Sequence, residues 1–175
     1  MSSCTDPVSE IVDVVVQAMR GAFNPEQECP PIGGGSETVR FLVSDAEAIP
    51  WNPQSNCKAP FLWVRVGSRF LSTVPTFPEA FVRDRGRCAA HDLARTVPLE
   101  VGVARCVATK APLTLDKVES ESEIALDDSW RIEGALTVAV QELRTDERAV
   151  ATDTVAVIGP AGGMVMVTGV VYVQF

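Results

Sequence analysis

The first segment with a clear hydrophobic pattern lies near the N-terminus. Between Val8 and Phe23 apolar residues recur every three or four positions, which predicts a helix with one apolar stripe. Asp6 is placed to cap this helix. Pro7 suits its first position, because the amide hydrogen that proline lacks would have no partner there. We therefore expect a helix that packs through one face.

Alternating patterns farther along the chain predict strands. A short strand is expected at Val39–Val43, and longer ones at Phe61–Val74 and Val97–Ala108. Two valine-rich stretches, 150–158 and 164–175, surround a cluster of glycines and one proline, which is the pattern of a β-hairpin. The C-terminal third is therefore expected to be mainly sheet.

The stretch Thr114–Leu143 has helical periodicity, but it contains a second possible start at Asp127 and Asp128. We expect either one helix or a broken pair, with these two aspartates capping the second part. Cation binding by the same carboxylates is the alternative. The apolar face of the second part is expected to comprise Trp130, Ala135, Leu136, Val138, Ala139 and Leu143.

These elements predict an α+β fold. The expected sheet is largely antiparallel or mixed, with about four to five strands, and the helices are separate from it. The 175 residues fit a single domain, residues 1–175. Two long loops are expected at about 24–60 and 76–96. Prolines and glycines prevent a helix in the first loop, and long loops are usually functional or flexible.

The sequence shows no run of roughly 18–20 apolar residues, the length that a membrane crossing requires. It also shows no secretion signal at its start. We therefore expect no membrane contact and a protein made in a cytoplasm. Free thiols are the expected state of the cysteines in that compartment. The five cysteines are Cys4, Cys29, Cys57, Cys88 and Cys106.

The formal net charge of −8 counts against binding to duplex nucleic acid, which normally needs a basic surface. The charge is also uneven. From Arg69 to Arg105 there are six arginines and four acids, whereas from Lys110 to Asp153 there are eleven acids and five bases. These stretches are either solvated surface or surfaces that meet between neighbouring copies, where complementary charge would set their orientation.

Candidate chemistry is sparse. His91 is the single histidine, and Cys88 precedes it by three residues. A structural zinc site needs four ligands, and a nucleophilic Cys–His pair needs a positioned base and usually a third orienting group. Neither glycine cluster, 33–35 or 159–163, has the context of a phosphate-binding loop or a dinucleotide fingerprint. We expect no catalytic residue, metal or cofactor.

Three segments together carry a family resemblance. They are Phe61–Val66, Leu99–Cys106 with its final Arg-Cys, and the closing pair 157–163 and 170–174. They resemble two central strands and the final hairpin of proteins at the head–tail junction of long-tailed actinobacteriophages, particularly the tail terminators. The resemblance covers about two-thirds of the chain, from Pro60 onward, and does not extend to the preceding loop.

The resemblance implies a non-enzymatic virion protein located in the tail or neck, and in the host cytoplasm during assembly. It would form a ring, of six copies, that caps the tail tube. Its partners would be itself, the tail-tube protein and the neck or stopper protein, and genomic DNA would pass through without specific binding. The alternatives are a head-closure (stopper) or other connector protein, and last a small enzyme or ligand-binding domain that uses Cys88 and His91. The candidate interface residues are Arg69, Arg83, Arg85, Arg87, Glu119, Glu121 and Glu123.

Overall fold

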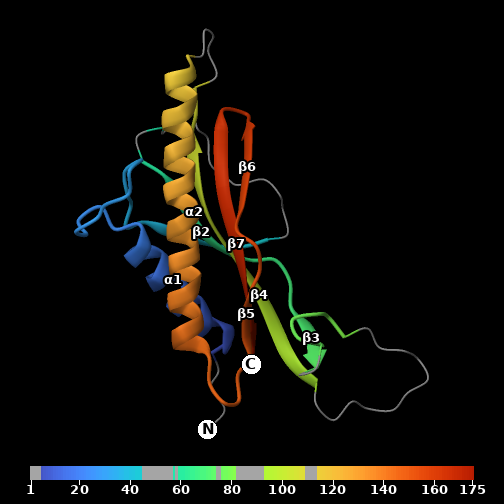
Figure 1. The fold of residues 1–175 in the computed structure, drawn as a ribbon. Coiled ribbons are helices and arrows are strands. Elements are labelled where there is room, and N and C mark those ends of the chain that lie inside the picture. The colour runs from blue at the N-terminus through green and yellow to red at the C-terminus, as the bar shows by residue number, and fades with distance from the viewer. Residues whose placement is uncertain (1–4, 45–56, 58, 74–75, 82–92, 109–113) are drawn as a thin grey trace.

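A computed structural model describes residues 5–44, 57, 59–73, 76–81, 93–108 and 114–175 of the chain. Within these residues, two helices cover one face of a seven-stranded mixed sheet (Figure 1). The α+β prediction is therefore confirmed. The sheet has more strands than the four to five expected, because two of the predicted strands are each divided into two shorter ones.

The strands are β1 (Val39–Val43), β2 (Phe61–Val66), β3 (Phe70–Thr73), β4 (Leu93–Cys106), β5 (Val150–Thr152), β6 (Ala156–Ala161) and β7 (Met164–Gln174). Their order across the sheet is β1-β2-β4-β7-β5, with β3 also on β4 and β6 also on β7. Only β1 and β2 pair in parallel among the described strands. The predicted strand at Val39–Val43 is confirmed with the same bounds.

Strands β4 and β7 form the centre of the sheet. They pair antiparallel from Thr96 opposite Gln174 to Cys106 opposite Met164. β2 and β3 follow one after the other along the outer edge of β4, and β5 and β6 do the same along β7. β4 begins at Leu93, inside the loop expected at 76–96, and the hairpin turn lies at Gly162 and Gly163, both with positive φ.

The core lies between this sheet and the helices α1 (Val8–Ala22) and α2 (Leu115–Leu143). The predicted stripe of α1 is buried. Pro7 occupies the N-cap position, which was expected for Asp6, and Asp6 Oδ1 accepts a hydrogen bond from the Val8 amide at 3.1 Å. Alternate residues of β4, from Val97 to Val103, face the helices with the inward residues of β2 and β7. Neither helix in this described part of the chain has the length and apolarity that a membrane crossing requires.

Helix α2 corrects two predictions. It is one continuous helix of 29 residues, so Asp127 and Asp128 lie inside it and cap nothing. Both carboxylates bind arginine side chains instead. Trp130 and Val138, which were assigned to the apolar face, are exposed, because the buried stripe consists of Ile132, Ala135, Leu136, Ala139 and Leu143, with Asp128 before it.

Candidate functional site

A buried ion pair joins the centre of α2 to the end of β4. Arg105 Nε donates to Asp128 Oδ2 at 2.6 Å, and Arg105 Nη2 donates to Oδ1 at 2.8 Å. Burial raises the pKa of the Asp128 carboxyl, and the Arg105 guanidinium opposes that rise. The same guanidinium donates to the carbonyl oxygens of Gly33 at 2.5 Å and Gly34 at 3.0 Å. One arginine therefore fixes both the helix and the glycine loop.

A second pair lies beside the first on α2. Arg131 Nε donates to Asp127 Oδ2 at 2.8 Å, and its other nitrogens donate to the carbonyl oxygens of Ala22 and Cys29, each at 3.0 Å. Asp127 Oδ2 also accepts a hydrogen bond from the Ile32 amide at 3.1 Å. The described part of the first long loop is therefore tied to α2 through its backbone.

This arrangement exposes a set of large apolar side chains, which we call the Trp130 patch. Trp130 is 73% exposed, Leu126 is 72% exposed and Ile32 is 66% exposed. These three side chains line one shallow hollow together with the acidic residues Glu123 and Glu133. Exposed apolar side chains that gather in one place mark interaction surfaces, and tryptophan is enriched among the residues that dominate binding energy.

A second hollow lies between α1 and the edge strand β1, and we call it the β1 hollow. Its apolar lining includes Val8 and Val12 from α1 and Phe41 and Val43 from β1. Its volume is about 470 Å³, which is within the range of pockets that hold small organic groups. Phe41 and Val43 are exposed. Asp6, Asp13 and Arg69 supply its charged lining.

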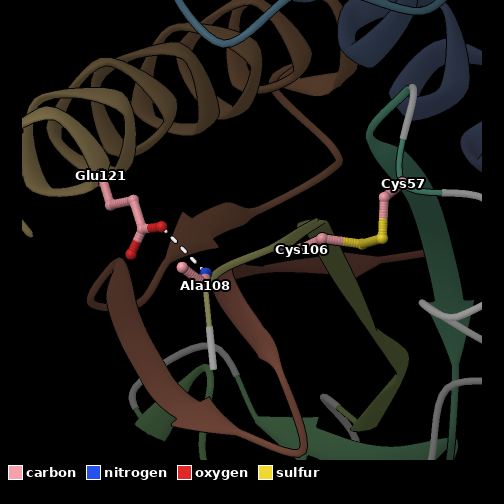
Figure 2. The surroundings of a disulfide bond; sticks show 4 residues. All are labelled: Cys57, Cys106, Ala108 and Glu121. Atoms are coloured by element: carbon pink, nitrogen blue, oxygen red, sulfur yellow. Dashed lines mark hydrogen bonds between the residues drawn. A yellow bond between two sulfur atoms is a disulfide. The ribbon is translucent and has the colours of Figure 1, made fainter. Parts of the chain in front are cut away.

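The candidate interface residues from the sequence are dispersed. Arg69 pairs with Asp6 at 2.5 Å, and this contact lowers the pKa of the Asp6 carboxyl. The three glutamates lie on the first turns of α2, where Glu119 and Glu123 are exposed. Glu121 accepts a hydrogen bond from the Ala108 amide at 2.9 Å (Figure 2). Arg83, Arg85 and Arg87 lie outside the described residues.

The cysteines correct another prediction. Cys57 and Cys106 form a disulfide that spans 49 residues, so these two are not free thiols. Figure 2 shows this bond near the Glu121–Ala108 contact. Cys29 is a free, exposed thiol, whereas Cys4, Cys88 and His91 lie outside the described residues. The part of the chain that the structure describes contains no group of three or more acidic, histidine or cysteine side chains that could hold a metal ion.

The face of the sheet away from the helices carries a third polar cluster. Glu100 accepts hydrogen bonds from Trp63 Nε1 at 2.9 Å and from Arg65 Nη2 at 2.6 Å. The Trp63 ring lies against Gly102, where a Cβ atom would overlap it. These residues come from adjacent strands, β2 and β4, and their side chains bind each other. The cluster therefore stabilises the pairing of the two strands.

The Trp130 patch was not predicted, although the sequence contains a signal for it. Residues four apart lie on one side of a helix, and Leu126, Trp130 and Val138 follow this spacing with Gly134 between the last two. The buried stripe through Ile132, Leu136 and Leu143 runs on another side of α2. Separating the two stripes would have placed Trp130 in solvent.

Comparison with protein-family models gives no match for this chain, and comparison with curated proteins gives no significant match.

Proposed function

We propose that this chain is a structural subunit that forms a ring at the end of a bacteriophage tail, as a tail terminator. The exposed Trp130 patch is the observation that carries the proposal. Asp127, which pairs with Arg131, accepts a hydrogen bond from the Ile32 amide, and Trp130 lies on the same helix as Asp127. Both the Ile32 and the Trp130 side chains nevertheless remain exposed. Because this exposure contributes nothing to the folding of one copy, the patch is better explained as a contact surface.

The arrangement of the strands also supports the proposal. The three segments that resemble tail terminators form β2, β4 and the β6–β7 hairpin, and these are neighbours in one sheet. A ring needs two different surfaces on each subunit, so that one face can meet another face of the next copy. The Trp130 patch and the β1 hollow are two such surfaces, because they share no residue.

In this role the ring would end the growing tail tube and present its outer face to the neck. The net charge of −8 agrees with a channel that DNA crosses without being held, because like charges repel. The basic residues would then serve contacts between proteins.

Immunogold electron microscopy of purified phage particles tests the proposal, with an antibody raised against this chain. We expect the label at the junction of head and tail, and peptides of the chain in mass spectra of the same particles. In tails that have not joined heads, a tail terminator remains bound to the tail end. A label confined to tail-free heads would instead identify a head-closure protein, and absence of the chain from particles and free tails would contradict a virion role.

A further inference from the structure

We propose that the Trp130 patch of one copy docks into the β1 hollow of a second copy, and that this contact joins subunits head to tail. The inference rests on the proposed self-assembly and names the surfaces that carry it. The patch supplies a projecting aromatic side chain. The hollow supplies an apolar recess of about 470 Å³, which is larger than an indole ring.

The patch is organised before any partner binds. Asp127 Oδ2 holds the Ile32 amide, and Arg131 holds both Asp127 and the carbonyl oxygen of Cys29. Trp130 projects from the middle of a 29-residue helix that packs against the sheet below it. A rigid surface loses little conformational entropy on binding, which favours its use as an anchor.

The β1 hollow is suited to receive such an anchor. Val43 is 73% exposed on the edge strand, beside the exposed Phe41. Val8 and Val12 on α1 line the hollow opposite them. An indole placed there would cover mainly the exposed side chains of Phe41 and Val43, above the buried Val8 and Val12, and cover of this kind is typical of binding hot spots.

The charges favour this pairing over contact between two Trp130 patches. The patch is lined by the acids Glu123, Asp127 and Glu133, and Arg131 pairs with Asp127, so the patch keeps an excess of negative charge. The hollow is lined by Arg69, Asp6 and Asp13, and the positive charge of Arg95 also lowers the pKa of the Asp6 carboxyl. Because positive and negative charges nearly balance in the β1 hollow, the hollow can accept the acidic rim of the Trp130 patch. Two Trp130 patches would instead bring like charges together.

The separation of the two surfaces on one copy suits a ring. The patch lies on α2 and the described part of the first loop, whereas the hollow lies between α1 and β1. One copy can therefore use both surfaces at the same time, with a different neighbour on each. Such heterologous contacts produce closed rings when the rotation between copies closes.

Sedimentation velocity of the whole chain over a range of concentrations tests the inference. Trp130→Ser removes the anchor and Val43→Glu places a negative charge opposite the acidic rim. We expect each variant alone to lose self-association by at least about tenfold, as for a hot spot. Val43→Lys should weaken it less than Val43→Glu. Leu115→Ser is the matched control, because Leu115 is 79% exposed on the same helix but outside the patch.

Mixing the two variants gives the decisive result. The Val43→Glu chain keeps an intact patch and the Trp130→Ser chain keeps an intact hollow, so the mixture should form a heterodimer and nothing larger. Thermal denaturation of each variant, followed by circular dichroism, checks that it is folded. All substituted side chains are exposed, so we expect folding to be retained.

Other outcomes overturn the inference in distinguishable ways. If Trp130→Ser prevents assembly and Val43→Glu does not, the patch meets some other surface of the second copy. If both variants assemble like wild type, the patch binds a different protein, and the proposed ring remains. If wild type itself stays monomeric at every concentration, both this inference and the proposed self-assembly are contradicted.

Discussion

Asp127 and Asp128 are adjacent on α2 but have different roles. Asp128 is buried and paired with Arg105 from the sheet, whereas Asp127 faces the glycine loop and pairs with Arg131. The sequence predicted carboxylates at a helix start, because local spacing shows the acids but not the arginine that folds next to them. Arg105 lies 23 residues away along the chain. Such a partner becomes visible only when the strand and the helix are packed together.

Asp128→Asn should lower the free energy of unfolding by about 3 kcal/mol, because it leaves the Arg105 guanidinium without its opposite charge in a buried site. Chemical denaturation measures the loss. Glu133→Gln on the exposed side of α2 is the control, and we expect it to change stability by less than about 0.5 kcal/mol. Equal losses in the two variants would contradict the assigned role of the pair.

Arg69→Gln should raise the pKa of the Asp6 carboxyl toward its ordinary value, because the Arg69 contact is the largest cause of the lowered pKa. A lowered folded pKa gives stability that is present above the unfolded value and is lost as pH falls through the folded value. The variant should therefore lose less stability on acidification. NMR titration of the Asp6 side chain measures the pKa, and an unchanged value would show that the contact is absent in solution.

At the scale of elements, periodicity predicted most of the fold. The α1 stripe and the strand at Val39–Val43 were predicted correctly. The boundaries of β4 and the division of the predicted strand 150–158 into β5 and β6 were not predicted, because they depend on which strands pair with each other in the sheet. Helix α2 shows a further limit, since its two apolar stripes have the same helical period and only packing distinguishes the core stripe from the exposed one.

Two glycines provide a matched test of element packing. Gly102→Ala places a methyl group where the Trp63 ring lies and should cost about 1–3 kcal/mol. Gly134→Ala has open space around it in the interior of α2 and should gain about 1 kcal/mol through helix propensity. Thermal or chemical denaturation measures both. A gain at position 102 would mean that Trp63 does not cover this part of β4.

At the scale of the whole molecule, the contacts that fix the first long loop join distant parts of the chain. The disulfide joins Cys57 to the end of β4. Arg105 on β4 binds the carbonyl oxygen of Gly33, and Arg131 on α2 binds that of Cys29. Composition predicted a long loop with little regular structure. It did not predict that the described part of this loop is bound to β4 and α2. Free thiols were expected because the protein was expected in a cytoplasm. The compartment does not show which cysteines the fold brings close enough to form a disulfide.

Replacement of Cys57 and Cys106 by serine should lower the free energy of unfolding by about 2–4 kcal/mol, the range for a cross-link that closes a long loop. Reduction of the wild-type protein should have the same effect. Cys29→Ser is the control, because Cys29 is exposed and makes no disulfide. If reductant changes the double variant as much as wild type, the stabilisation does not come from this bond.

Electron microscopy and native mass spectrometry of the purified wild-type protein test whether it assembles into a ring. We predict closed rings with a central opening, and a mass equal to a single whole number of chains, six by the resemblance to tail terminators. A protein that remains monomeric at all concentrations, or that forms only open chains of variable length, would contradict it.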